Sequence, residues 1–321
     1  MYSKRISLPI IVIALTLVLT AGLAAAQMSA NPPDVGERIR ALGNQLTPEV
    51  VAATNQIYAP LLKEAPKDGV VVTKDQPYGT DERQRLDVYQ PEKKPAVPTP
   101  ILVFVHGGGF VRGDKREFEN VGDYFARRGV LAITINYRFA PKNRWPSGGE
   151  DLAAALRWIR ENGLKYGGNG DRVFLMGTSA GAAHVATYVF FENVQLKGGD
   201  GVAGAILFSG PTYDTSRLDP QKDNVYYGDD VSKYPAMSVI AHLEGRKIPV
   251  FIVVAELDPP SIHYQNRALI DALYDRDKAL PAVKLLLGHN HISEISHINT
   301  RDESIGPDIL EFIRIHSGKA G

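Results

Sequence analysis

The 321-residue sequence contains no cysteine, and this absence excludes several kinds of chemistry at once. A chain without cysteine cannot form disulfides, bind a metal through thiolates, use a cysteine nucleophile or carry a lipid on a cysteine. The chain also lacks net charge, because 36 Lys and Arg residues balance 36 Asp and Glu residues, and it has no Lys/Arg-rich run. Nucleic-acid-binding proteins usually carry a basic surface, so we expect no nucleic-acid partner.

The first 26 residues have the pattern of a secretory signal peptide. Lys4 and Arg5 precede an uncharged run rich in Ile, Leu and Val over residues 6–19, and Ala24-Ala25-Ala26 provides a cleavage site before Gln27. We therefore expect an exported protein, periplasmic or secreted, with no stable membrane association after cleavage. The alternative is an uncleaved membrane anchor, since the uncharged run continues to Ala26 and could just span a bilayer.

Beyond the signal peptide, the chain divides into a helical extension and one larger α/β region. Residues 27–68 are polar and favour helix, with Thr47 and Pro48 as the start of a helix; this extension either packs on the domain or forms part of a lid. Residues 69–321 then alternate short apolar runs with amphipathic stretches. The alternation predicts a mainly parallel sheet of about eight strands with helices on both faces.

The expected strands and helices are defined by apolar runs and apolar stripes. The strands are expected at 69–73, 85–89, 101–105, 130–135, 172–176, 202–208, 249–255 and 282–287, and the helices at 114–127, 147–159, 182–191, 261–274 and 307–315. Ser147 and Glu150 have the spacing of a capping box at the start of their helix. The polar stretch 211–246 interrupts the alternation and contains four tyrosines, so it is the candidate for an inserted cap.

Gly177-Thr178-Ser179-Ala180-Gly181 reads G-x-S-x-G and lies between a predicted strand and a predicted helix. In that context the motif indicates a nucleophile elbow, a sharp turn that exposes a serine hydroxyl on strained backbone. The two glycines remove side chains where the strand and the helix approach each other. The alternative is a chance match, because only three positions of the motif are fixed.

A glycine run, His106-Gly107-Gly108-Gly109-Phe110, follows the strand expected at 101–105. Glycines there leave backbone N–H groups uncovered, and such donors stabilise the oxyanion that develops in acyl transfer. A phosphate-binding loop or an ordinary turn is the alternative, but the run matches neither G-x-x-x-x-G-K-[ST] nor G-x-G-x-x-G.

Together with Asn136-Tyr137-Arg138-Phe139-Ala140-Pro141, these two motifs resemble the H-G-G-G branch of the α/β-hydrolase superfamily, the hormone-sensitive-lipase-like serine carboxylesterases. The resemblance covers about residues 70–316. It implies an α/β-hydrolase fold with a small cap. It also implies an oxyanion hole formed by the N–H groups of Gly108, Gly109 and Ala180, and a structural role for His106.

A serine nucleophile needs a base, and the base needs an orienting carboxylate, which in this fold follow the serine in the order acid, then histidine. Asp258 and Glu256 lie after the strand expected at 249–255, and the resemblance favours Asp258; an N-cap of the next helix is another role for Asp258. His289 and His291 follow the last strand, and the resemblance favours His291, because an apolar residue follows it.

A metal site formed by His289, His291 and Glu294 is a further alternative for these residues, but no third ligand elsewhere and no supporting pattern is evident. We therefore expect neither a cofactor nor a metal.

The motifs predict a serine carboxylesterase that hydrolyses small or short-acyl esters through an acyl-enzyme. Alternatives with the same fold are an amide or arylformamide hydrolase and a polysaccharide (acetyl or feruloyl) esterase, because a fold does not determine the substrate. A non-catalytic small-molecule binding protein is the alternative of another class. A peptidase of this fold would usually carry an added propeller domain. The sequence does not predict an oligomeric state.

Overall fold

A computed structural model describes residues 33–318 of the chain. Its centre is one eight-stranded sheet in the order β1-β2-β4-β3-β5-β6-β7-β8. β2 pairs antiparallel with β1 and β4, and all other neighbours are parallel, which confirms the predicted sheet. The strands are β1 (Val70–Pro77), β2 (Arg85–Pro91), β3 (Thr99–Val105), β4 (Leu131–Ile135), β5 (Gly168–Thr178), β6 (Gly204–Phe208), β7 (Val250–Leu257) and β8 (Ala282–Asn290).

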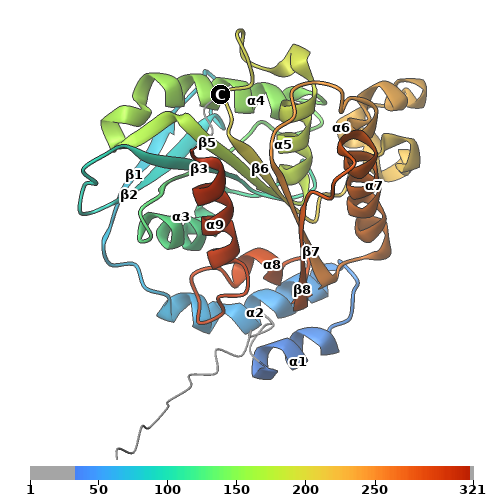
Figure 1. Cartoon of the computed structure of the whole chain (residues 1–321). Coiled ribbons are helices and arrows are strands. Elements are labelled where there is room, and N and C mark those ends of the chain that lie inside the picture. Colours follow the sequence, from blue (N-terminus) through green and yellow to red (C-terminus); the bar gives the residue numbers. More distant parts are fainter. Residues whose placement is uncertain (1–32, 319–321) are drawn as a thin grey trace, which may run out of the picture.

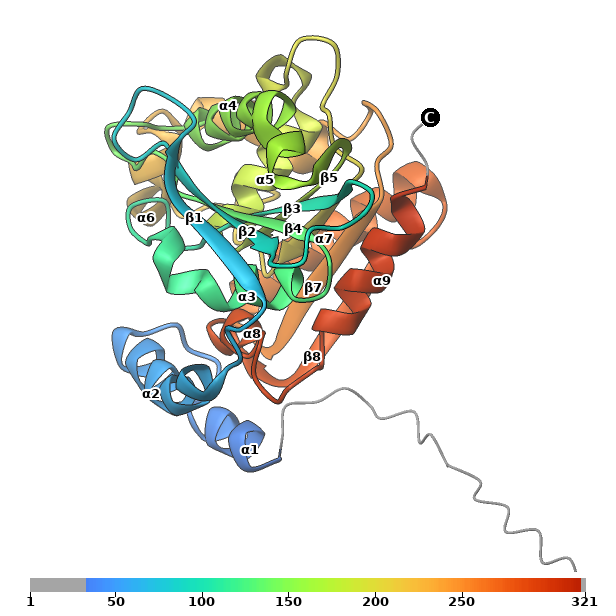
Figure 2. The ribbon, with the colours of Figure 1, turned by 90° about the vertical axis from the view of Figure 1, so that its left-hand side faces the viewer.

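Helices cover both faces of the sheet (Figures 1 and 2). On one face, α4 (Ser147–Asn162), α5 (Ala180–Phe190) and α7 (Pro260–Asp277) bury Leu156, Val185 and Leu269 in one apolar cluster. On the other face, α3 (Glu119–Ala126) and α9 (Gly306–His316) contribute Phe125 and Phe312 to a second cluster. The central strands are buried on both sides, which explains why they read as continuous apolar runs.

Two N-terminal helices, α1 (Pro33–Ala41) and α2 (Pro48–Glu64), lie below β8 and the short helix α8 (Ser293–Ser296) in Figure 1. Thr47 caps α2 as expected, because its hydroxyl accepts a hydrogen bond from the Val50 N–H at 3.3 Å. α1 packs on β8, and α2 packs on α8. The expected signal peptide, residues 1–26, lies outside the described residues, and among those described no helix is both long and apolar enough to cross a bilayer.

The capping box expected at Ser147 and Glu150 is wrong. The N-cap of α4 is Pro146, and no side chain caps the helix. The Ser147 hydroxyl instead donates to the Asn143 carbonyl at 3.0 Å, because the preceding turn folds back against it. Glu150 pairs with Arg138 at 3.0 Å rather than returning to the helix end.

The segment 211–246 folds into α6 (Pro220–Tyr227) and three short 3₁₀ turns. Three of its four tyrosines, Tyr226, Tyr227 and Tyr234, are buried in an apolar cluster with Phe110 and Ala183, whereas Tyr213 joins the cluster under α4, α5 and α7. The Tyr226 ring stacks on the Phe110 ring, with centroids 4.2 Å apart. This segment therefore packs directly on the glycine-run loop and on the helix that follows Ser179.

Candidate active site

Ser179 lies at the turn between β5 and α5, with φ 52° and ψ −124°. A non-glycine residue rarely adopts a positive φ, so the backbone is strained at this serine. The flanking glycines make the strained turn possible. A β-carbon on Gly177 would lie 2.4 Å from the Gly181 carbonyl carbon, and one on Gly181 would lie 2.1 Å from the Val105 carbonyl oxygen.

The glycine-run loop lies against this serine. A β-carbon on Gly107 would be 3.0 Å from the Ser179 β-carbon and 3.7 Å from its hydroxyl oxygen. Gly108 and Gly109 have φ values of 126° and 60°, conformations that favour glycine. Ala180 is the first residue of α5, so its N–H has no acceptor within the helix.

His106, at the head of the glycine run, is buried beneath this loop. Its Nδ1 lies 2.6 Å from the Gly107 carbonyl oxygen, and its ring stacks on Tyr137 with centroids 4.5 Å apart. Burial lowers the pKa of His106 to about 4, so the ring is neutral at pH 7. The neutral imidazole therefore packs between Tyr137 and the start of the glycine run and supports that loop.

Asp258 and His291 form a buried pair at the ends of β7 and β8. His291 Nδ1 lies 2.7 Å from Asp258 Oδ1. The other Asp258 oxygen accepts hydrogen bonds from the Ala255 N–H at 3.0 Å and from the Ser209 hydroxyl at 2.5 Å. Asp258 does not cap α7, whose N-cap is Pro259. The carboxylate is therefore fixed on both of its oxygens and directed at one imidazole.

Glu256, the alternative acid, faces a different part of the fold. Its Oε2 accepts the Gly288 N–H at 2.6 Å and pairs with Arg40 of α1 at 3.0 Å. The alternative base, His289, contacts Asp302 and Ser293 instead of Asp258. Glu256 lies within β7, whereas Asp258 follows the last residue of that strand.

The His291 pair connects to the elbow through the neighbours of Ser179. The Ser179 N–H donates to the Phe208 carbonyl at 2.9 Å, and the next residue, Ser209, bonds Asp258. His291 Nε2 is buried and has no hydrogen-bond partner among the described residues, Ser179 Oγ included. This nitrogen is therefore available, and catalytic hydrogen bonds are often long in unliganded sites.

Two further residues complete this network: Ser209, which no sequence pattern indicates, and Glu294, for which the sequence indicates no role beside Asp258. The Ser209 hydroxyl bonds both Asp258 and Glu294, and Ser209 also has a positive φ of 43°. Glu294 Oε1 accepts the Thr178 hydroxyl at 3.1 Å, next to Ser179. From the sequence, Glu294 is a candidate only for a metal site together with His289 and His291. The structure does not bring these three side chains together, because each has a different partner.

Glu294 is fully buried, and burial raises its pKa far above the usual value of 4.5; the negative charge of Asp258 raises it further. A neutral Glu294 has a proton to donate. Since the Ser209 hydroxyl carries one hydrogen, Glu294 can donate to Ser209 while Ser209 donates to Asp258. One hydroxyl thus bridges the two carboxyl groups, and a proton on Glu294 avoids repulsion between two buried negative charges.

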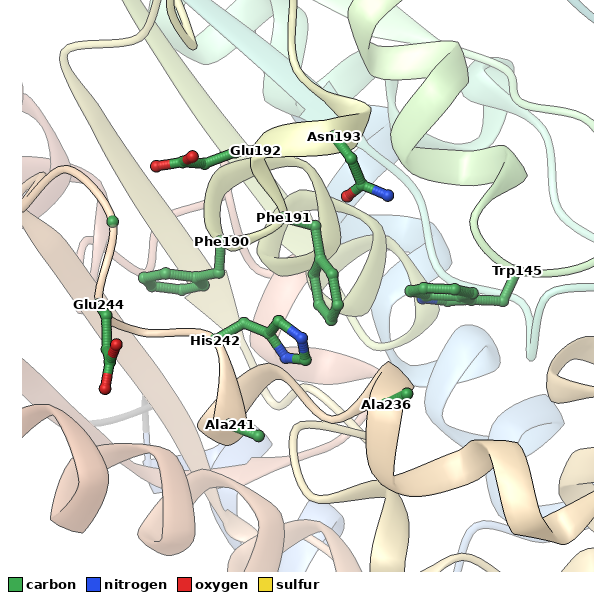
Figure 3. Close-up of a pocket in the computed structure, with 10 residues that line it drawn as sticks. Trp145, Phe190, Phe191, Glu192, Asn193, Ala236, Ala241, His242 and Glu244 are labelled. Atoms are coloured by element: carbon green, nitrogen blue, oxygen red, sulfur yellow. The ribbon is translucent and has the colours of Figure 1, made fainter.

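The surface hollow in Figure 3, of about 580 Å³, does not belong to this site. It is lined by residues at the C-terminal end of α5, including Phe190 and Phe191, together with Trp145 and His242. Ser179 precedes the first residue of the same helix, and ten residues of helix span about 15 Å. The hollow and the elbow therefore lie at opposite ends of α5.

Comparisons with known proteins agree with this architecture. The family model described as BD-FAE matches residues 86–199. Esterase LipQ of Mycobacterium tuberculosis is 26% identical over 267 residues, which cover 77% of this chain and 63% of that protein. Esterase LipC of the same organism is 38% identical over 105 residues, 32% of this chain and 26% of that protein. The chain thus spans less than two thirds of each of these relatives.

Solved structures show the same fold at low identity. Esterase B from Lactobacillus rhamnosis superposes with a TM-score of 0.71 at 20% identity, covering 89% of this chain and 96% of that one. A bacterial heroin esterase superposes with a TM-score of 0.67 at 20% identity, covering 90% and 98%. The sheet order, the flanking helices and these neighbours establish an α/β-hydrolase fold.

Proposed function

Because the chain has an α/β-hydrolase fold and its sequence is similar to esterases, we propose that it is a serine carboxylesterase with Ser179 as nucleophile, His291 as base and Asp258 as orienting acid. The observation that carries the proposal is the combination of a strained serine with a buried imidazole whose Nδ1 is held by a carboxylate at 2.7 Å. Holding Nδ1–H on Asp258 directs the lone pair of Nε2 outward, as a general base requires.

In the proposed reaction, His291 Nε2 accepts the Ser179 hydroxyl proton while the serine oxygen bonds to the ester carbonyl carbon. The tetrahedral intermediate collapses as the bond from this carbon to the alkoxy oxygen breaks, and the alcohol leaves with the proton from His291. Water then attacks the acyl-serine by the same route and releases the acid. Asp258 stays ionised and stabilises the imidazolium at each step.

The negative oxygen of the intermediate would be bound by the N–H groups of Gly108, Gly109 and Ala180. Support comes from the loop's contact with Ser179 and from the position of Ala180 at a helix N-terminus. Removing one donor of an oxyanion hole typically lowers turnover by about 10²–10³. Because these donors are backbone N–H groups, their directions depend on the conformations of Gly108 and Gly109 and on the position of Ala180 at the start of α5, not on any side chain.

We infer small or short-acyl esters as substrates. The segment 211–246 places Tyr226 and Tyr227 against Phe110, at the end of the glycine run, and all three rings are buried. An aromatic wall so close to the oxyanion loop limits the room beside the acyl carbon. A series of p-nitrophenyl esters of rising chain length, with an arylformamide for comparison, measures this preference.

The function is tested with Ser179→Ala. The variant should lose p-nitrophenyl acetate hydrolysis by at least ~10⁴-fold and lose labelling by a fluorophosphonate, while it folds normally. Ser317→Ala, a serine after the end of α9 whose hydroxyl donates to the Ile313 carbonyl of that helix, is the matched control and should keep both. Full activity in Ser179→Ala would contradict the assignment of the nucleophile.

We also propose export through residues 1–26, on the sequence pattern alone. Intact mass of the protein recovered from the producing cells should correspond to a chain that begins at Gln27. Recovery of full-length chain in the membrane fraction would instead indicate the uncleaved anchor.

A further inference from the structure

Four polar side chains from the end of β8 and the segment before α9 meet in a second buried cluster, the 289/304 cluster: His289, His297, Asp302 and Ser304. All four are almost completely buried. His289 Nε2 lies 3.1 Å from Asp302 Oδ2 and 3.4 Å from Ser304 Oγ, and His297 Nε2 lies 3.2 Å from the same hydroxyl. The proposed esterase reaction uses none of these groups.

The Nδ1 atoms of His289 and His297 already have partners outside the cluster, and the Nε2 atoms of both rings face it. His297 Nδ1 lies 2.9 Å from the Ser293 carbonyl oxygen, which can only accept, so this Nδ1 carries the hydrogen. His289 Nδ1 lies 3.2 Å from the Ser293 hydroxyl, which itself donates to the Asn290 carbonyl at 3.3 Å. In the neutral rings, both Nε2 atoms therefore present lone pairs to the same point.

Asp302 adds an oxygen to these lone pairs. Its Oδ1 accepts the Ser304 N–H at 2.9 Å. Its Oδ2 is buried and has no hydrogen-bond partner among the described residues, although it lies only 3.1 Å from His289 Nε2. The two atoms are thus close together without a hydrogen bond that joins them. Side-by-side donors that face a common point are typical of metal ligands, whereas hydrogen-bond partners point at each other.

The geometry points to a metal site, and we propose that the 289/304 cluster binds one Zn²⁺ through His289 Nε2, His297 Nε2 and Asp302 Oδ2. Tetrahedral bonds of about 2.0–2.1 Å place ligand atoms about 3.3 Å apart, close to the separations of 3.1–3.4 Å within the cluster. The three ligand atoms all lie within 4.8 Å of one another. The Ser304 hydroxyl, or a water bonded to it, supplies the fourth position.

The chemistry of the ligands favours zinc over harder cations. Two imidazoles and one carboxylate suit Zn²⁺, whereas Ca²⁺ and Mg²⁺ prefer an all-oxygen shell. Both imidazoles have their Nδ1–H bound to Ser293, the supporting contact that metal-binding histidines commonly make. The site would be structural, since it would link the end of β8 to the segment that precedes α9.

The test uses the untagged full chain produced in zinc-supplemented medium. Inductively coupled plasma mass spectrometry should find roughly one zinc per chain, and dialysis against a chelator should remove it and lower the Tm by several degrees. Asp302→Asn and His297→Gln should each lose the bound zinc. His242→Gln, a half-buried histidine of the surface hollow, is the control and should retain it.

Two results would overturn the site. One is a wild-type protein with less than a tenth of a zinc per chain whose Tm does not respond to added Zn²⁺; the cluster would then be an internal His289–Asp302 ion pair. The other is unchanged zinc content in both ligand variants. Should a variant fail to fold, Co²⁺ binding by the demetallated wild type decides, since histidine-bound Co²⁺ gives visible absorption bands. Ser179→Ala should bind zinc normally, which separates this proposal from the esterase proposal.

Discussion

The elbow around Ser179 and the network around His291 serve one proposed reaction, but the chain builds them in opposite ways. The elbow consists of backbone: a positive φ at Ser179 and glycines whose β-carbons would collide with main-chain atoms. The His291 network consists of side chains: Asp258, Ser209 and Glu294 are joined by hydrogen bonds across 49 to 85 residues of sequence. A backbone device tolerates no added atom, whereas a side-chain network depends on protonation and hydrogen-bond direction.

The difference predicts two kinds of sensitivity. Substitutions of the elbow glycines should act first on stability, because overpacked main-chain atoms cannot move aside. Substitutions in the network should act first on turnover or on pH dependence, because the shapes of Asp and Asn, or of Glu and Gln, are nearly the same. The next three experiments examine this division, from the largest expected effect to the smallest.

Asp258→Asn should reduce kcat by about 10⁴-fold, because an amide at this position no longer holds His291 in the required tautomer and no longer stabilises its charged form. The matched control is Glu256→Gln, two residues away, whose kcat should change by less than about threefold, since Glu256 bonds Gly288 and Arg40 rather than His291. Steady-state kinetics with p-nitrophenyl acetate measure both. A large loss in Glu256→Gln with little loss in Asp258→Asn would exchange the two assignments.

Gly177→Ala should lower the free energy of unfolding by at least ~3 kcal/mol, since its β-carbon would meet the Gly181 backbone at 2.4 Å. Gly170→Ala, in the same strand, is the control, because the nearest atom to its β-carbon lies 4.0 Å away. Its stability should change by less than about 0.5 kcal/mol. Urea unfolding followed by circular dichroism measures both, and equal stability of the two variants would argue against an elbow that is closed by backbone contact.

Glu294→Gln should change the pH dependence of stability and leave kcat within a few-fold of wild type. The folded pKa of Glu294 lies above its unfolded value of about 4.5, so its contribution to stability is complete below that pH and is lost as pH rises toward the folded pKa. Glutamine does not titrate. The variant should therefore gain on wild type as pH rises from 5 to 8, by at most ~1.4 kcal/mol per pH unit.

Thermal unfolding of both proteins across this pH range checks the prediction, with the exposed Glu161→Gln as a control whose difference from wild type stays constant. A Glu294→Gln variant that is equally destabilised at every pH would mean that Glu294 is an ionised acceptor. The single hydrogen of the Ser209 hydroxyl could then not bond both carboxylates at once.

The same division explains what the sequence could predict. The sheet of eight strands follows from apolar runs, and the expected strand positions agree with the structure to within a few residues. G-x-S-x-G and the glycine run are local patterns with local steric causes, so their positions beside each other could be anticipated. The assignment of Asp258 and His291 depended on resemblance, because nothing in the residues themselves separates them from Glu256 and His289.

Ser209 and Glu294 left no recognisable pattern in the sequence. A serine after a strand and a glutamate on a short helix are common, and only the fold places the Ser209 hydroxyl between Glu294 and Asp258. The capping box at Ser147 was wrong for a related reason, since a turn formed by the residues before it takes its hydroxyl. Side-chain partners far apart in the chain, or across a turn, are decided by tertiary packing.

The Asn290 side chain ties the two ends of the described chain together. It donates to the Thr54 hydroxyl of α2 at 2.9 Å, and its oxygen accepts the N–H groups of Ile292 and Ser293 at 3.1 and 3.0 Å. A helix near the start of the described chain thus supports the loop that carries His291 near its end. A shortened chain without α1 and α2 would lack this contact and should hold that loop less firmly.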